Sequence, residues 1–221
     1  MKIISCGDSY TLGEGLSSPE ETYGYLLAKE FKSDYTTLAQ SGASEYLILS
    51  QIEEAVKLNP DLILVGHTSE YRWQVRSRRN NKWQGFLVAN FIEQNKKLFR
   101  QWIFSEQLLD NKRNSAEHKA AWHAAGLLYY SEDKIVNNLW KSAVALQINI
   151  LKRYNIRAVH IACFGHLHND LKELTDDCIY APLDDMKHIQ KANDGSHAGP
   201  AIHEKVCKEI SKFILNKSRL T

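Results

Sequence analysis

The chain has 221 residues, of which 43% are hydrophobic and 24% are charged, values that exclude a disordered chain and suit one globular domain with a full hydrophobic core. Its 28 basic and 26 acidic side chains nearly cancel, which leaves a net charge of +2. Such a balance gives no overall field that would favour nucleic acid or an anionic membrane as a partner.

The first third of the chain alternates strand and helix patterns. Apolar residues at 2–6 predict a buried strand, and a second β-prone run covers 35–40. Between them, 23–31 carries apolar residues at helical spacing. A serine at the start of 44–58 is a suitable N-cap for a second helix, which an Asn-Pro pair ends. The run 61–65 then predicts a third buried strand.

The rest of the chain contains one long helical stretch and one more strand pattern. From about 72 to 154 there is no strand pattern, but there is helical periodicity, and all five tryptophans lie there. We expect a crossover helix plus a helical insertion in this segment. A fourth buried strand is predicted at 156–164, and an amphipathic helix at 204–215. The alternation predicts a flavodoxin-like, three-layer α/β/α fold with a central parallel sheet, in a single domain covering 1–221.

The amino-terminal segment and the cysteines bear on where the protein works. The first apolar run passes directly into a glycine turn and is too short for a signal peptide. No segment reaches the roughly 20 apolar residues that span a bilayer. The cysteines have no CxxC spacing, which favours buried free thiols over zinc sites or disulfides: Cys6, Cys163, Cys178 and Cys207. We therefore expect a cytoplasmic protein without a membrane span or a bound metal.

Polar, glycine-marked turns follow three of the predicted strands. They are Gly7-Asp8-Ser9, 41–44 (Ser-Gly-Ala-Ser) and 66–70 (Gly-His-Thr-Ser-Glu). In a parallel α/β sheet the carboxyl ends of the strands meet at one edge, where ligands bind. These turns should therefore converge on one rim.

A loop before the last helix carries an aspartate three residues ahead of a histidine, Asp194 and His197. The carboxylate can hold one nitrogen of the imidazole while the other nitrogen faces a serine hydroxyl such as that of Ser9. A serine nucleophile needs such a base, a group that orients the base, and donors for the oxyanion. This spacing favours nucleophilic catalysis at the rim.

These elements, in this order, resemble those of the SGNH hydrolases, also called the GDSL family of esterases and acylhydrolases. The matching residues are Gly7-Asp8-Ser9, Gly42, Gly66 and Asp194-x-x-His197.

The resemblance implies an ester hydrolase that works without metal or organic cofactor. By it, Ser9 is the nucleophile, His197 the general base and acid, and Asp194 the residue that orients the histidine. The backbone N–H groups of Ser9 and Gly42 would bind the oxyanion. The family covers lipid, acetylated-sugar, aryl-ester and thioester substrates, and nothing in this sequence chooses among them.

The third turn departs from the family pattern. The family usually has Gly-x-Asn-Asp, whose asparagine amide supplies a further oxyanion donor, and Thr68 stands at that position here. A threonine hydroxyl can donate one hydrogen bond, so we expect Thr68 either to replace that donor or to be a plain strand-end residue. Asp8, His67, Arg72 and Trp73 are the expected substrate-binding residues.

Two other functions remain open. The missing asparagine favours a binding protein on the same fold with weak or lost catalysis. The run Gly165-His166-Leu167-His168 matches the Gly-His-x-His block of metallophosphoesterases, which hold two metals. The other ligand blocks of that family are missing from the sequence, so the phosphoesterase reading has the least support.

Overall fold

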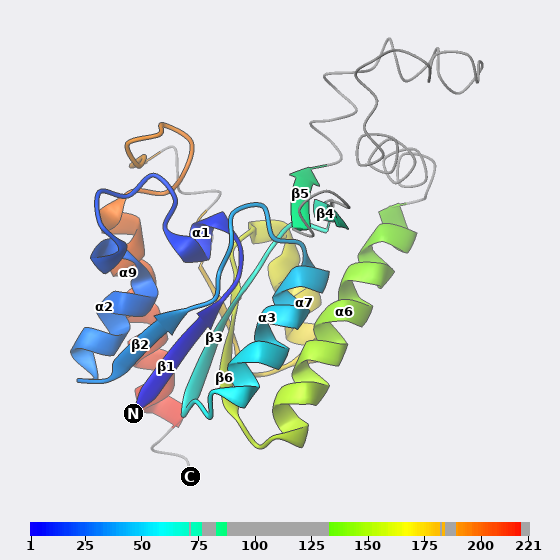
Figure 1. Ribbon diagram of the computed structural model, residues 1–221, viewed down its shortest axis with the longest axis horizontal. Helices are drawn as coiled ribbons and strands as arrows, with labels where there is room; N and C mark the ends of the chain where they lie inside the picture. The colour runs from blue at the N-terminus through cyan, green and yellow to red at the C-terminus, as the bar shows by residue number, and fades with distance from the viewer. Residues whose placement is uncertain (71, 77–82, 88–132, 182, 184–188, 218–221) are drawn as a thin grey trace.

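The computed structural model describes residues 1–70, 72–76, 83–87, 133–181, 183 and 189–217. Its main sheet is parallel throughout and has five strands in the order β2-β1-β3-β6-β7 (Figure 1). The strands are β1 (Lys2–Cys6), β2 (Asp34–Thr37), β3 (Leu62–His67), β6 (Arg157–Ala162) and β7 (Cys178–Tyr180). The parallel sheet predicted from the sequence is confirmed, although β7, which has only three residues, was not predicted.

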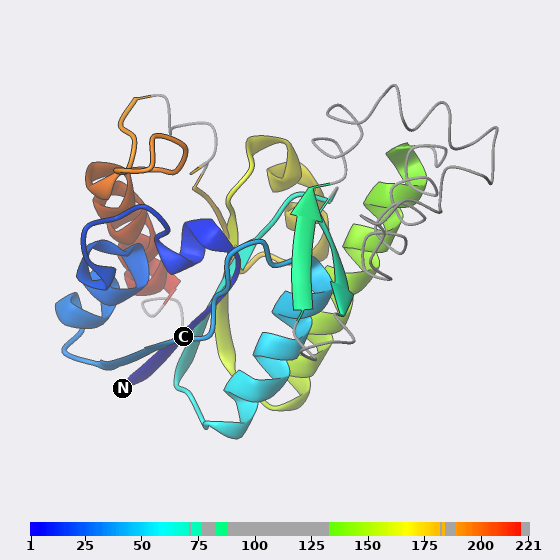
Figure 2. The same cartoon turned by 45° about the horizontal axis from the view of Figure 1, so that its top comes forward.

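Helices cover both faces of this sheet, as the two views of the molecule show (Figures 1 and 2). On one face lie α2 (Tyr23–Glu30) and α9 (Pro200–Lys217), which pack against each other. On the other lie α3 (Glu45–Lys57), α6 (Asp133–Arg153) and α7 (His168–Leu174). The predicted three-layer α/β/α fold is therefore confirmed.

Alternate residues of the central strands supply the two cores. In β3, Leu62 and Leu64 pack with α2 and α9, whereas Ile63 and Val65 pack with α3. Because successive side chains of a strand point to opposite faces, a strand buried on both faces must be apolar at every position. This requirement explains the unbroken apolar runs by which the strands could be recognised.

Local signals explain where α3 begins and ends. Ser44 occupies the N-cap position in an extended conformation, and Glu45 and Lys57 place an acidic residue in the first turn and a basic one in the last. Both charges interact favourably with the helix dipole and so stabilise the helix ends. After the helix, Asn59 adopts a positive φ of 49° before Pro60 and the start of β3. The predicted helix is thus confirmed to within one residue at its end.

The segment after β3 corrects one expectation. Strands β4 (Arg72–Arg76) and β5 (Trp83–Leu87) form an antiparallel pair outside the main sheet, so the prediction that no strand lies in this segment was wrong. The signal was present, since Trp73 and Val75 alternate with polar residues at a period of two. The predicted crossover helix is present as α6, and residues 88–132 of the expected insertion lie outside the described residues.

The described part of the chain contains no helix that is long and apolar enough to cross a membrane. The cysteines are all buried free thiols, as their spacing predicts.

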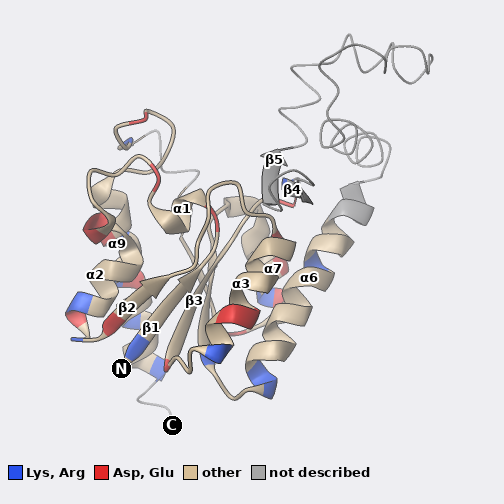
Figure 3. Cartoon of the chain, in the orientation of Figure 1, with Lys and Arg blue, Asp and Glu red and all other residues tan. Residues whose placement is uncertain are grey.

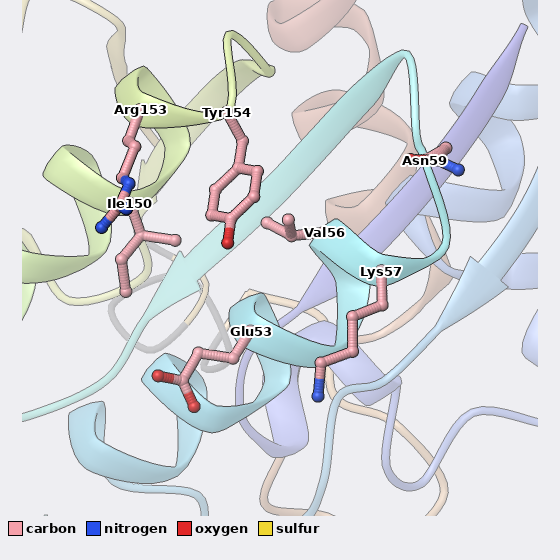
Figure 4. Close-up of a pocket in the computed structure, with 7 residues that line it drawn as sticks. All are labelled: Glu53, Val56, Lys57, Asn59, Ile150, Arg153 and Tyr154. Carbon is pink, nitrogen blue, oxygen red and sulfur yellow. The ribbon is translucent and has the colours of Figure 1, made fainter.

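A groove of about 600 Å³ lies between α3 and α6. Its walls come from the carboxyl-terminal halves of both helices, as Figure 4 shows: Glu53, Val56, Lys57, Asn59, Ile150, Arg153 and Tyr154. That end of α3 leads into the start of β3. The groove therefore lies at the amino ends of the strands, away from the turns that carry the candidate catalytic residues.

The buried His203 of α9 should make stability depend on pH. Its Nδ1 accepts from the Tyr23 N–H at 3.2 Å, and burial lowers the pKa of His203 to about 4. In the unfolded chain a histidine titrates near pH 6.5, so between about pH 6.5 and 4 the unfolded state binds a proton that the folded state does not. The free energy of unfolding should therefore fall by up to about 3 kcal/mol as the pH falls through this window.

Urea unfolding at several pH values measures this dependence. His203→Asn keeps an acceptor for the Tyr23 N–H but does not titrate, so it should remove part of the slope. A residual slope should remain because burial also holds the pKa of His160 well below its ordinary value. An unchanged slope in the variant would show that His203 is not responsible.

Candidate active site

The turn after β1 places Ser9 at the start of α1 (Ser9–Leu12). Asp8 is the N-cap, and its Oδ1 accepts from the Tyr10 N–H at 3.0 Å. Ser9 is only 3% exposed. Close packing requires the preceding glycine, since a Cβ on Gly7 would lie 2.1 Å from Thr11 Oγ1. The sequence therefore builds a tight strand-to-helix turn around the serine.

A side chain of α3 also holds this turn. Gln51, which is buried, accepts from the Gly7 N–H at 2.7 Å and donates to the Gly7 carbonyl at 3.2 Å. The pair of bonds fixes the two peptide groups on either side of the Gly7 Cα, just before Asp8 and Ser9. Nothing in the sequence marked Gln51 for this role, because it is one polar residue on an otherwise apolar helix face.

The loop before α9 brings Asp194 and His197 together. His197 Nδ1 lies 2.5 Å from Asp194 Oδ2, and Asp194 Oδ1 accepts from the N–H groups of Ser196 at 2.9 Å and of His197 at 3.1 Å. The Ser196 N–H and the His197 ring hold the pKa of the Asp194 carboxyl well below its usual range. The carboxylate is therefore charged and fixes the orientation of the imidazole.

Contacts between two loops bring this pair next to α1. The Asn193 N–H donates to the Gly15 carbonyl at 2.9 Å, and the Tyr10 and His197 rings meet edge to face with centroids 5.1 Å apart. His197 thus packs against the residue that follows Ser9. Within the described chain Ser9 Oγ makes no hydrogen bond to His197, and catalytic hydrogen bonds often tighten only when substrate is bound.

Glu14 is a residue of this region that the sequence analysis did not single out. Its Oε2 lies 4.0 Å from His197 Nε2 and accepts from Ser41 Oγ at 2.5 Å. Ser41 precedes Gly42, whose φ of 72° defines the turn after β2. Glu14 therefore connects the histidine to the second strand-end turn. Its place between two glycines was the available signal.

The third turn is buried at His67, Thr68 and Ser69. Thr68 is fully buried, and its hydroxyl donates to Asp8 Oδ2 at 2.9 Å. Arg72 Nη1 lies 3.2 Å from the same oxygen. Burial raises the pKa of the Asp8 carboxyl, while Arg72 and the Thr68 hydroxyl oppose that rise. The carboxylate next to the serine is thus held by a cation and a hydroxyl inside the protein.

A second buried carboxylate lies beside the third turn. Glu45 accepts from the Thr68 N–H at 2.8 Å, from His67 Nδ1 at 3.1 Å and from Gln147 Nε2 at 2.9 Å. The other ring nitrogen of His67 lies 2.9 Å from His160 Nδ1. The His67 side chain is therefore engaged on both sides within the protein.

The expected substrate-binding residues are placed as follows. Asp8 and His67 are fully buried, and their polar atoms bind other protein groups. Arg72 is directed at Asp8 with its side chain 15% exposed. These positions favour support of the site over direct contact with substrate. The side chain of Trp73 lies outside the described residues.

The histidines that suggested a phosphoesterase lie on the same rim. His166 Nε2 pairs with Glu70 Oε2 at 2.9 Å, and the His168 ring lies 5.1 Å from that of Tyr180. Among the described residues, no group of three or more His, Cys, Asp and Glu side chains could hold a metal ion. Figure 3 marks Asp and Glu positions in red in the loops of this rim, and both acidic and basic positions toward the opposite end of the sheet.

No protein-family model matches the chain, and no curated protein sequence matches it significantly. Solved structures do match. The psychrotrophic esterase EstA from Pseudoalteromonas sp., solved in a form inhibited by monoethylphosphonate, is 10% identical with a TM-score of 0.54, over 99% of this chain and 98% of its own. A protein described as a GDSL-like lipase from Parabacteroides merdae is 13% identical with a TM-score of 0.54, over 96% of this chain and 95% of its own.

A third match has a longer chain. The acetyl xylan esterase Est2A from the rumen bacterium Butyrivibrio proteoclasticus is 14% identical with a TM-score of 0.56, over 100% of this chain and 65% of its own. At these identities the likeness concerns the fold. The chain therefore has the α/β/α fold of the SGNH/GDSL hydrolases, as its motifs predict.

Proposed function

We propose that the protein is a serine esterase that cleaves a carboxylic ester through an acyl-enzyme on Ser9. The observation that carries this proposal is the Asp194–His197 pair, joined at 2.5 Å and packed against α1, the helix that Ser9 begins. A charged carboxylate on one imidazole nitrogen is one part of a nucleophilic triad, and the proposal adds Ser9 as the group that the other nitrogen serves.

The first half of the reaction acylates the enzyme. Ser9 Oγ attacks the carbonyl carbon of the ester, and its proton passes to His197 Nε2. The backbone N–H groups of Ser9 and Gly42 bind the oxygen that becomes negative. When the tetrahedral intermediate collapses, the bond to the alcohol oxygen breaks and His197 gives its proton to the leaving alcohol.

The second half releases the acid. A water molecule loses a proton to His197 Nε2 and attacks the acyl carbon, and the bond to Ser9 Oγ then breaks as His197 returns the proton to it. Asp194 keeps the imidazole in the required tautomer and stabilises its charged form throughout. These steps use only groups of the chain and water, so the proposal includes no cofactor.

The substrate class is proposed only as a carboxylic ester, such as a lipid or an acetylated sugar. The proteins with similar structures are described as an esterase, a GDSL-like lipase and an acetyl xylan esterase. The engagement of Thr68 with Asp8 favours the alternative of weak catalysis, because it leaves fewer oxyanion donors. That alternative is an outcome of the test below.

Labelling with a fluorophosphonate tests the proposal, because the probe reacts with activated serines. We expect labelling at Ser9, together with hydrolysis of p-nitrophenyl esters whose rate depends on acyl chain length. Added EDTA should change neither. Failure of the probe to label, with no ester hydrolysed, would favour the non-catalytic alternative. Inhibition by EDTA that manganese or zinc reverses would favour the phosphoesterase.

Gly15 offers a separate check on the placement of Asp194. Its φ is 81°, and an added Cβ would lie 2.5 Å from Asp194 Cγ. Gly15→Ala should displace the carboxylate and lower kcat by roughly 10- to 100-fold, since a misplacement of about 1 Å can cost about 100-fold. Gly195→Ala is the matched control, because Gly195 also has a positive φ of 69° but its Cβ would meet nothing within 4 Å. Equal losses in both variants would assign the effect to backbone strain instead.

A further inference from the structure

Thr68 binds three separate elements through its polar atoms. Its hydroxyl donates to Asp8 Oδ2 at 2.9 Å, its N–H donates to Glu45 Oε1 at 2.8 Å, and its carbonyl accepts from Trp140 Nε1 at 3.0 Å. The partners lie in the turn after β1, in α3 and in α6. Thr68, which follows β3 and is fully buried, therefore ties these elements to the centre of the sheet.

The bond to Asp8 acts on the nucleophile turn. Asp8 directly precedes Ser9, and its other oxygen caps α1 through the Tyr10 N–H at 3.0 Å. A movement of the Asp8 carboxylate would therefore move the start of α1, and with it the Ser9 N–H. Arg72, 3.2 Å from Asp8 Oδ2, supplies the positive charge that keeps this buried carboxylate in place.

The bond to Glu45 acts on the turn after β2. Glu45 is the first residue of α3, three residues after Gly42. Besides the Thr68 N–H, its carboxylate accepts from His67 and Gln147, and it is 4% exposed. A shift of Glu45 would therefore move the start of α3, and with it the turn that carries Gly42.

We propose that Thr68 is a positioning residue that holds the Ser9 and Gly42 N–H groups in register. The proposal rests on the proposed function, in which these two groups bind the oxyanion. A hydroxyl has one proton, and Thr68 donates it to Asp8, so it does not donate to a substrate oxygen at the same time. The family resemblance implies an asparagine donor at this position. In this chain Thr68 instead links the turns that carry the other two donors, the Ser9 and Gly42 N–H groups.

Kinetics of two substitutions give the first test. Thr68→Val removes the hydroxyl at nearly constant volume, and it should lower kcat by roughly 10- to 100-fold with KM changed less, because the donors shift relative to the transition state. Thr68→Ser keeps the hydroxyl and should restore most of the rate. Thr175→Val is the matched control, because the Thr175 hydroxyl binds the Asp177 N–H at 3.1 Å near the start of β7, away from the rim.

A double-mutant cycle separates the bridge from a direct oxyanion donor. Asp8→Ser keeps a side-chain oxygen that can cap α1 but removes the second oxygen, to which the Thr68 hydroxyl donates. If Thr68 acts through Asp8, adding Thr68→Val to Asp8→Ser should lower kcat by no more than about threefold further, since coupled residues lose their effect together. If the Thr68 hydroxyl binds the oxyanion directly, the two losses should multiply, and the proposal would be overturned.

Hydrogen exchange tests the bridge without relying on activity. Thr68→Val removes the hydroxyl bond to Asp8 and keeps the N–H bond to Glu45, so it should speed amide exchange in the segment 7–13 and leave β7 unchanged. Unchanged exchange in the segment 7–13 would overturn the bridge even if the protein is an active esterase. If the wild type is inactive but Thr68→Val still exchanges faster than the wild type, the proposed function is overturned and the positioning role is retained. The two failures are therefore distinguishable.

Discussion

Ser9→Ala should abolish ester hydrolysis, with kcat reduced by roughly 10⁴- to 10⁶-fold and no labelling by a fluorophosphonate. The serine hydroxyl forms the acyl bond in the proposed reaction, and alanine has no nucleophile at that position. The free energy of unfolding should change by less than about 1 kcal/mol, because Ser9 Oγ makes no hydrogen bond within the described chain and only one oxygen is removed. Steady-state kinetics and urea unfolding of the same preparation measure both quantities.

Two outcomes would contradict this prediction. A variant that retains its activity would remove Ser9 from the reaction outright. If Ser9→Ala loses activity only because it unfolds, Ser9→Cys tests the role of the hydroxyl instead. Ser9→Cys keeps a nucleophile at the same place and should still react with the probe at a measurable rate.

His197→Ala should reduce kcat nearly as much as the serine change, because the groups of a triad act as a unit and the loss of either stops proton transfer. Asp194→Asn should cost less, roughly 10²- to 10⁴-fold, since the imidazole remains but its tautomer and orientation are no longer held at 2.5 Å by a carboxylate. The double variant of Ser9 and His197 should be no slower than either single variant. Kinetics on one p-nitrophenyl ester measure the series.

Asp194→Asn should also remove a small, pH-dependent contribution to the free energy of unfolding. Because the Asp194 pKa is held below its usual range in the folded state, the carboxylate contributes stability above about pH 4, and this is lost as the pH falls further. The Asp194 side chain is 30% exposed, so solvent screens the contribution and it should be small.

If His197→Ala keeps nearly normal activity, another group serves as the base.

The sequence by itself determined the parts of this protein that depend on local pattern. The apolar runs at 2–6 and 61–65 could be recognised as strands because both of their faces are buried. Asp194 and His197 could be paired because their contact joins residues three apart within one loop. The order of Ser9, the glycine turns and this pair was enough to predict the fold, whereas a catalytic site formed by these residues stays a prediction.

Only the tertiary structure decided what Thr68 binds. Its hydroxyl meets Asp8 across 60 residues of chain, and His67 meets His160 across 93. Neither the direction of a hydroxyl nor the partner of a buried histidine follows from residue type, because both depend on which strands lie side by side and on the register between them. The same reason hid Glu14, whose place near His197 exists only once two loops have packed together.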